Sequence, residues 1–457
     1  MTDAHIRYTP GDGLSYDPSE AVYWEAAGLR QETLRTFEIC HGCRLCFKYC
    51  DAFPRLFALL DESHGGDVRR ITAAETDRVM AACFQCKLCE VQCPYTRRER
   101  HPFQLDFPAL VHRHRAQRRR RLAPTLRDRV LGNPDLTGRL ARWSGGLVNA
   151  AHRIRPVRWL LERTLGIHRD KLLPPFARRS FDAWARRTGR TRGPGGEAVL
   201  FPTCYVQHNA PELGRDTVEV LERNHVDVRC VAGLRCCGMP AWERGDLAAV
   251  RRQARANLAR LAPHVEQGAK VLAINPTCAM MMRREHPGLL EPAERAAAGR
   301  LAAAVMDPGE FLWGIRDEPR FNADFRSTPG PIAYQAPCHL RAQGVGFRGR
   351  DLLRRIPGVR VSTVLECSGH DGTYAMTVEG FAPSTRIGRK AIAGLREAEA
   401  AVWATDCPLA ALQFEQHGGR RALHPMSILA RAYRPDGFPE PVPAGSGAPP
   451  PGGSGAA

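Results

Sequence analysis

The sequence predicts a multidomain protein: a helical domain with two cysteine motifs, a basic helical connector, and two tandem α/β cysteine-rich domains. Three observations support this fold class. Eight cysteines follow one spacing twice, residues 97–192 are strongly basic, and three cysteine positions after residue 196 recur at offsets of 129 to 134 residues. A chain of 457 residues has room for several domains. We expect domains at 25–110, 111–195, 196–325 and 328–435, then a disordered tail at 436–457.

The first domain is defined by two copies of the motif C-x2-C-x2-C-x3-C, at residues 40–50 and 83–93. This spacing holds a four-iron cubane, because three thiolates of one copy bind one cluster and the fourth reaches the other cluster. We therefore expect two [4Fe-4S] clusters. Their ligands would be Cys40, Cys43, Cys46 and Cys93 for one cluster, and Cys83, Cys86, Cys89 and Cys50 for the other.

Zinc and disulfides explain these cysteines less well. Zinc sites use pairs of C-x2-C, so a third cysteine at the same step has no role in a tetrahedral site. Residues 1–30 are polar and contain no apolar signal core, so nothing indicates an oxidising compartment. The two copies also differ: Pro94 follows the second, whereas Asp51 follows the first. We expect the first loop to be less rigid for this reason.

Helices are predicted around both motifs. One should run from about Ala26 to Ile39 and lead into Cys40, and another should span Ala73 to Ala82. Between the motifs, apolar residues recur at helical spacing; these are Phe53, Leu56, Phe57, Leu59 and Leu60. A helical insert favours the α-helical two-cluster ferredoxin domain over the small ferredoxin built on strands.

The connector carries the excess charge of the chain. Residues 97–192 contain 25 Arg or Lys and 7 Asp or Glu, and the difference equals the net charge of +18. An apolar stripe at steps of three and four predicts an amphipathic helix interrupted at Pro156; it comprises Leu136, Leu140, Trp143, Leu147, Ala151 and Ile154. A solvated connector, a peripheral contact with an anionic membrane and a dock for an acidic partner remain open. Nucleic acid is not expected, because no recognition motif is present.

The C-terminal part consists of two similar halves. Each begins with a short apolar strand, at 198–201 and at 332–335, and alternates strands with helices, which predicts parallel α/β sheets. The cysteines follow strands, where open α/β sheets bind ligands. The candidate metal ligands are Cys204, Cys236, Cys237 and Cys278 in the first repeat, and Cys338, Cys367 and Cys407 in the second.

This order of motifs resembles the heterodisulfide-reductase-related iron–sulfur family, over about residues 35–435. The stretches Pro337–Leu340 and Cys367–Tyr374 are similar to the branch of anaerobic glycerol-3-phosphate dehydrogenase C subunits. The resemblance implies that the ferredoxin domain carries electrons. It also implies that the cysteine-rich domains bind a further iron–sulfur cluster or a structural metal such as zinc. In some members this centre reduces a disulfide or supplies electrons to quinone.

Departures from the family pattern limit what the resemblance implies. Met281 and Ala410 replace the last cysteine of each repeat, and Ser368 replaces the second cysteine of the second Cys-Cys-Gly. The first repeat retains four thiols, enough for a cubane or for zinc. The second retains three thiols, with His339 as a candidate fourth ligand.

We interpret the chain as the electron-transfer subunit of an oxidoreductase complex, between a flavoprotein dehydrogenase or other redox protein and quinone or another acceptor. Two alternatives are a reductase acting at the Cys204–Cys278 site and a zinc scaffold that binds nucleic acid. No stretch of 18 apolar residues is present, so no membrane span is expected. Sixteen cysteines without a secretory signal indicate the cytoplasm, with a peripheral place on the inner face of the cell membrane as an option.

Overall fold

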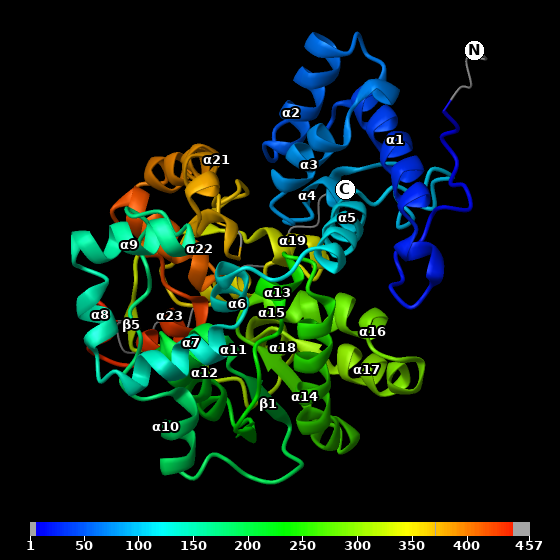
Figure 1. Cartoon of the computed structure of the whole chain (residues 1–457). Helices are drawn as coiled ribbons and strands as arrows, with labels where there is room; N and C mark the ends of the chain where they lie inside the picture. Colours follow the sequence, from blue (N-terminus) through cyan, green and yellow to red (C-terminus); the bar gives the residue numbers. More distant parts are fainter. Residues whose placement is uncertain (1–5, 371, 442–457) are drawn as a thin grey trace, which may run out of the picture.

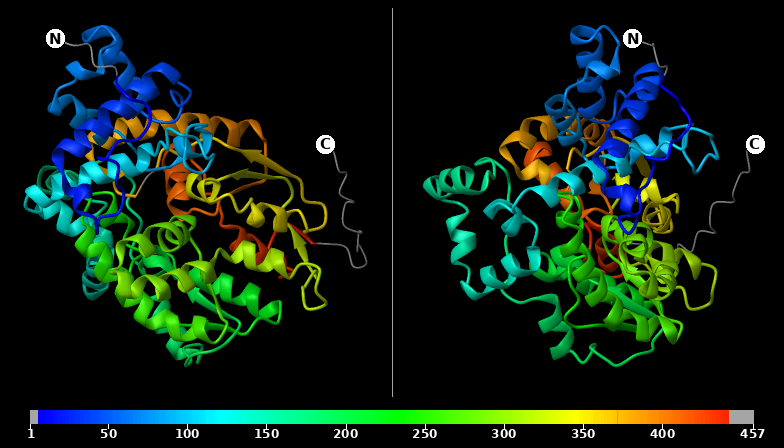
Figure 2. Two further views of the ribbon diagram at one scale, coloured as in Figure 1. Left: turned by 90° about the vertical axis from the view of Figure 1, so that its right-hand side faces the viewer. Right: turned by 45° about the vertical axis from the view of Figure 1, so that its right-hand side comes forward.

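The computed structural model describes residues 6–370 and 372–441 and is mostly helical (Figure 1). The N-terminal helices, drawn in blue, form one layer above the two repeats in both figures of the whole chain (Figures 1 and 2). The predicted helix at 26–39 is present and continues through Cys43. The elements of this layer are η1 (Ala21–Trp24), α1 (Ala26–Cys43), α2 (Ala52–Ala58), η2 (Leu59–Ser63), η3 (Val68–Arg70), α3 (Ala73–Ala81) and α4 (Leu88–Gln92).

Helix α5 (Phe107–Arg121) joins this layer to the first repeat. Its residues Leu110 and Val111 belong to the N-terminal core, whereas Ala116 packs in the core of the first repeat. The expected domain boundary after residue 110 therefore falls inside a helix, because one helix serves two cores.

The apolar stripe of the connector is divided between two short helices, at 134–143 and 147–151, and its last residue, Ile154, precedes a third. The break lies at Gly145 and Gly146, which have φ of +61° and +106°, a conformation that glycine adopts without steric cost. Pro156 starts a helix instead of interrupting one, since proline is tolerated in the first turn. The connector comprises α6 (Leu126–Leu131), α7 (Pro134–Trp143), α8 (Leu147–Ala151), α9 (Arg155–Leu165) and α10 (Phe181–Arg187).

The first repeat contains a parallel sheet of order β2-β1-β3-β4, as the alternation of strands and helices predicts. Helices cover it, and the helices that directly follow β1 and β3 carry Cys204 and Cys278. Its elements are β1 (Ala198–Phe201), α11 (Thr203–His208), α12 (Pro211–Arg223), β2 (Val228–Cys230), α13 (Met239–Trp242), α14 (Leu247–Glu266), β3 (Lys270–Ala273), α15 (Pro276–Met280), η4 (Met281–Glu285), α16 (His286–Leu289), α17 (Pro292–Ala304), β4 (Val305–Met306) and α18 (Pro308–Gly314).

The second repeat has the same plan with three parallel strands in the order β7-β6-β8. Aligned with the first repeat, β6 takes the central place of β1. Its elements are β5 (Ser327–Thr328), β6 (Ile332–Gln335), α19 (Cys338–Gln343), α20 (Arg348–Leu353), β7 (Val361–Val364), η5 (Tyr374–Met376), α21 (Val378–Glu397), β8 (Val402–Ala404), α22 (Pro408–Gly418), α23 (Pro425–Ala432) and β9 (Glu440–Pro441).

The predicted disordered tail at 436–457 begins too early. Phe438 is buried in the core, and β9 pairs antiparallel with β5. The part of the predicted tail at 442–457 lies outside the described residues. Among the helices that the structure describes, none has the length and apolar character needed to cross a bilayer.

Candidate metal sites formed by four groups of cysteines

The first group of thiols surrounds a cavity. Cys40 and Cys43 lie at the end of α1, while Cys46 and Cys93 come from the loops of the two motifs. Burial, and then the thiols of Cys46, Cys93 and Cys43, raise the pKa of Cys40. The four thiols that the motif spacing pairs are thus neighbours in space, which fits a group that binds them as thiolates. The cavity is otherwise lined by Ile39, Leu45, Phe53, Phe57, Pro94, Tyr95 and Leu105.

The second group is buried and consists of Cys50, Cys83, Cys86 and Cys89. Burial raises the pKa of Cys89, and the thiols of Cys86, Cys83, Cys46 and Cys50 raise it further. Backbone N–H groups point at these sulfurs: Gln85 donates to Cys83 Sγ at 3.4 Å, and N–H groups of α2 favour the Cys50 thiolate. Such donors stabilise thiolates, so the residues present fit an iron–sulfur cluster.

The two motif loops are fixed in different ways. Pro94 follows the second motif, whereas Asp51 after the first motif forms an ion pair with Arg386 of α21. This pair ties the first loop to the second repeat. The loop that we expected to be less rigid is therefore held by a tertiary contact in place of a proline ring.

The third group lies at the strand ends of the first repeat and comprises Cys204, Cys236, Cys237 and Cys278. A hydrogen bond with Cys236 is the largest cause that raises the pKa of Cys204, followed by burial. Gly238 has φ of +93° and its N–H group donates to Cys236 Sγ at 3.4 Å. Asp135 of α7 accepts a hydrogen bond from the Cys236 N–H group at 2.8 Å.

The fourth group comprises the three cysteines of the second repeat. Burial, then Cys367 and Cys407, raise the pKa of Cys338. Gly369 repeats the role of Gly238, with φ of +74° and an N–H group 3.4 Å from Cys367 Sγ. The Cys-Cys-Gly backbone is therefore preserved where Ser368 replaces a cysteine.

His339 does not serve as the expected fourth ligand. Both of its ring nitrogens are used: Thr277 Oγ1 lies 2.8 Å from Nδ1, and the Gln85 carbonyl oxygen lies 2.9 Å from Nε2. Burial lowers the pKa of His339 to about 4, so the ring is neutral near pH 7. No ring nitrogen is left for a metal in this arrangement.

The second motif lies at the junction of the two repeats. Its helix α4 packs against α19. Burial raises the pKa of Cys86 most, and among the thiols Cys338 raises it most. Lys87 forms a buried ion pair of 2.7 Å with Glu285 of η4. The sequence alone does not indicate the roles of Lys87, Glu285 and Asp135, because a single charged residue gives no pattern that distinguishes a buried polar contact from a solvated side chain.

Comparison with known proteins agrees with this architecture. The family model described as "Cysteine-rich domain" matches residues 198–283 and 332–415, which lie in the two repeats. The C subunit of anaerobic glycerol-3-phosphate dehydrogenase from Escherichia coli (strain K12) is 31% identical over 313 residues, 68% of this chain and 78% of that protein. The chain belongs to this cysteine-rich family. The resemblance that the motifs suggested is confirmed.

Other relatives match shorter parts of the chain at lower identity. Lactate utilization protein A of Bacillus licheniformis is 28% identical over 183 residues, 39% of this chain and 74% of that protein. The B subunit of fumarate reductase (CoM/CoB) from Methanothermobacter marburgensis is 24% identical over 255 residues, 54% of this chain and 48% of that protein. Two of the three names describe subunits of oxidoreductases.

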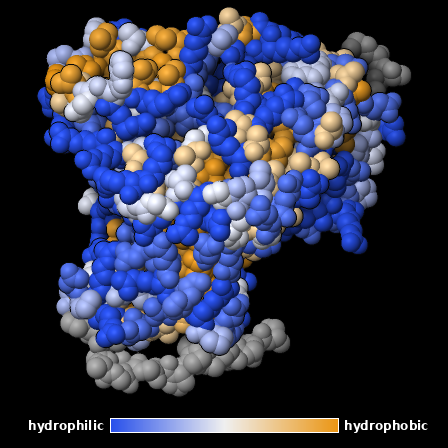
Figure 3. All heavy atoms as spheres, turned by 90° about the horizontal axis from the view of Figure 1, so that it is seen from below, coloured by the Kyte–Doolittle hydropathy of each residue, from blue (hydrophilic) through white to orange (hydrophobic). Residues whose placement is uncertain are grey.

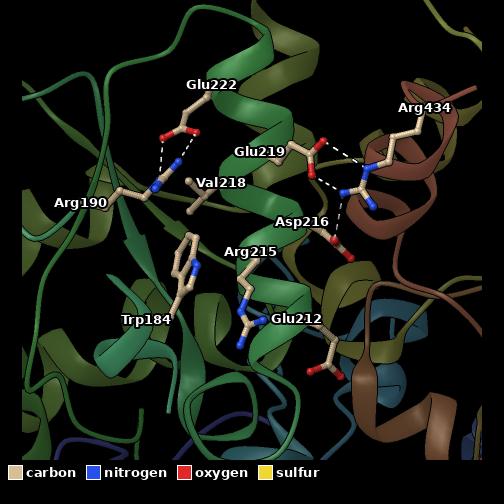
Figure 4. A pocket seen from close by; sticks show the side chains of 9 residues that line it. All are labelled: Trp184, Arg190, Glu212, Arg215, Asp216, Val218, Glu219, Glu222 and Arg434. Atoms are coloured by element: carbon tan, nitrogen blue, oxygen red, sulfur yellow. Dashed lines mark hydrogen bonds and ion pairs between the residues drawn. The ribbon is translucent and has the colours of Figure 1, made fainter. Parts of the chain in front are cut away.

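One cavity of this family member lies away from the cysteines. It measures about 460 Å³ and is bordered by α12, with ion pairs from Glu222 to Arg190 and from Glu219 to Arg434 (Figure 4). Within residues 6–370 and 372–441, no three or more His, Cys, Asp and Glu side chains are arranged to hold a single metal ion. The case for bound clusters therefore rests on the grouping of the thiols, their N–H donors and the cavity of the first group.

Proposed function

We propose that this chain is an iron–sulfur electron-transfer subunit with two [4Fe-4S] clusters in its N-terminal domain. The observation that carries the proposal is the grouping of eight thiols into the two groups of four that the motif spacing pairs. When bound, such clusters accept and release single electrons. The N–H groups of Gln85 and of α2 would stabilise the thiolate ligands, and burial of the second group would exclude water.

The arrangement of the four groups supports a relay. The thiol of Cys46, in the first group, adds to the rise in the pKa of Cys89 in the second group. Cys338 of the fourth group acts in the same way on Cys86 of the second. Cys407 of the fourth group acts in the same way on Cys278 of the third. Each group therefore has a neighbour, and together they form a path from the N-terminal layer to the first repeat. We assign a further cluster or zinc to the third group, which retains four thiols.

The partners follow from this role. Because the relative from Escherichia coli is named as one subunit of a dehydrogenase, we propose a flavoprotein dehydrogenase as the electron donor or acceptor of this chain. Quinone or another acceptor would take the other end of the relay. The substrate of that relative is not assigned to this chain, because its name describes the whole dehydrogenase and not the C subunit alone.

The surface of the connector is the reason for proposing a peripheral membrane contact. Its apolar stripe faces outward: Trp143 is 93% exposed and Leu147 is 75% exposed. Figure 3 shows apolar side chains gathered at one corner of the surface, on the side where Figure 1 places α7 and α8. Exposed arginines lie beside the stripe, and this combination is typical of helices that bind anionic membranes; they are Arg139, Arg153 and Arg155.

Metal analysis of anaerobically purified protein tests the proposal. We expect about eight irons per chain from the two cubanes and more if the third group is loaded. The reduced protein should be paramagnetic with interacting clusters. Stoichiometric zinc with almost no iron, after oxygen-free reconstitution, would contradict the proposal.

Vesicle binding tests the membrane contact separately. We expect the protein to sediment with vesicles of phosphatidylcholine and phosphatidylglycerol, and less with phosphatidylcholine alone. Trp143→Ala should weaken the binding, whereas Trp313→Ala, in the first repeat away from the connector, should not. Equal sedimentation of both variants would show that the stripe is not the contact.

A further inference from the structure

His339 contacts the segments that carry three of the four groups of cysteines. Its backbone N–H group favours the thiolate of Cys338, in the fourth group. Its Nδ1 atom lies 2.8 Å from the hydroxyl of Thr277, the neighbour of Cys278 in the third group. Its Nε2 atom lies 2.9 Å from the carbonyl oxygen of Gln85, within the second motif. The side chain is buried, with 5% of the residue exposed.

These contacts fix one tautomer of the ring. A carbonyl oxygen can only accept a hydrogen bond, so the proton is on Nε2 and donates to Gln85. The Nδ1 atom therefore accepts the hydrogen bond of the Thr277 hydroxyl. A buried imidazole with both nitrogens satisfied is held rigidly, because loss of either bond would leave a polar group unpaired.

The contact with Gln85 acts on the position of a thiol. The carbonyl belongs to the peptide that precedes Cys86, so its hydrogen bond fixes the plane of that peptide. Gln85 has φ of +55°, a left-handed conformation that is strained for a residue with a side chain and needs support from its surroundings. Cys86 is the thiol of the second motif that packs beside Cys338.

We propose that His339 is a positioning residue that joins the second cysteine motif to both repeats and sets the spacing of three groups of thiols. The proposal rests on the proposed function to the extent that this spacing governs electron exchange between bound clusters. His339 does this work without binding metal. It acts as an outer support of the sulfur ligands, and such supports orient the ligands and tune the bound metal.

Two variants and one matched control test the role. His339→Phe keeps a ring of similar size and removes both hydrogen bonds, whereas Thr277→Val removes only the bond to Nδ1. The control is His424→Phe, because His424 is also buried and uses both nitrogens, with Nε2 at 3.1 Å from the Ile274 carbonyl and Nδ1 accepting from Met426. His424 joins the two repeats, but its two hydrogen bonds go to Ile274 and Met426 and not to the second motif.

The measurements are iron and zinc per chain, spin–spin splitting in the reduced protein, electron exchange between its centres, and hydrogen exchange of residues 83–93 in metal-free protein. We expect unchanged metal content in all variants. His339→Phe should alter the splitting, speed the hydrogen exchange and slow electron exchange by about tenfold, the lower end of typical effects for outer supports. Thr277→Val should change the same three quantities in the same direction but by less. His424→Phe should leave the hydrogen exchange of residues 83–93 at the wild-type rate.

Two results would overturn the proposal. Loss of one metal centre in His339→Phe but not in His424→Phe would show that His339 is a ligand. Wild-type hydrogen exchange, splitting and electron exchange in His339→Phe would show that it positions nothing. If the wild-type protein holds no iron, the proposed function fails first, while hydrogen exchange of the metal-free protein still decides the positioning role.

Discussion

The two cysteine-rich repeats share a backbone plan but differ in what covers their cysteine ends. Gly238 and Gly369 donate to the sulfur two residues earlier in the same way. The first repeat is covered by α7 of the connector through Asp135, whereas the second repeat is covered by the second cysteine motif through Cys86. The repeats thus supply equivalent sulfur-bearing segments, and the covering segment determines whether these sulfurs face the basic connector or the second cysteine motif.

The largest effect should come from removing a thiol of the first repeat. Cys237→Ala should abolish metal binding by the third group, because three thiols remain of four. The iron of the N-terminal motifs should be unchanged. Metal analysis and electron paramagnetic resonance of anaerobic protein check this expectation. Cys230→Ala is the control, since Cys230 is buried in a core away from these thiols; equal metal content in the two variants would show that the third group is empty in the wild type.

The next effect concerns the contact between the second motif and the first repeat. Lys87→Met leaves Glu285 buried without its partner, which should destabilise the protein by about 3–5 kcal/mol. Anaerobic denaturant unfolding of metal-free protein measures this. Arg300→Met is the matched control, because its ion pair with Glu266 is 59% exposed at both side chains and should contribute at most about 1 kcal/mol. Equal losses would mean that Lys87 is not buried against the repeat.

The sequence could predict the groups of thiols and the repeats, because both depend on short-range spacing and periodicity. It could not predict where the second motif lies. That position depends on contacts between residues far apart in the chain, such as Lys87 with Glu285 and His339 with Gln85. A histidine after a cysteine suggests a ligand until both of its nitrogens are found to be occupied.

The packing of the connector was likewise not predictable from the sequence. Its spacing predicts an apolar stripe but not the side of the helix that packs on the protein. The packed side of α7 includes Gly138, where a Cβ atom would clash with the ring of His208. This close approach to α11 turns Leu136, Leu140 and Trp143 outward. A glycine in a helix is ordinarily unfavourable, so sequence reasoning gave it no role.

A pH dependence should follow from His424, which links the repeats. Burial lowers its pKa to about 4, below the usual value of about 6.5. The unfolded chain therefore binds the proton first as the pH falls, and stability present above pH 6.5 is lost between pH 6.5 and 4, by about 3 kcal/mol. The cost of His424→Phe should accordingly shrink over this range. Unfolding of both proteins at several pH values measures it, and a cost independent of pH would show that His424 titrates normally.

The smallest effect should distinguish the coverings of the two repeats. Asp135 raises the pKa of Cys204 and of Cys236 by its charge, while it accepts the Cys236 N–H bond. Asp135→Asn retains an oxygen acceptor but loses the charge, so it should cost about 1 kcal/mol of stability.

The same substitution should lower the pKa of the thiols of the first repeat, because the negative charge that opposed thiolate formation is gone. Alkylation of metal-free protein against pH, read by mass spectrometry, should therefore shift to lower pH for Cys204. Cys338 should keep its profile, because its neighbouring charge is Arg341, which favours the thiolate. A shift at both cysteines would mean that Asp135 acts on the whole junction, and the covering helix would then not separate the two repeats electrostatically.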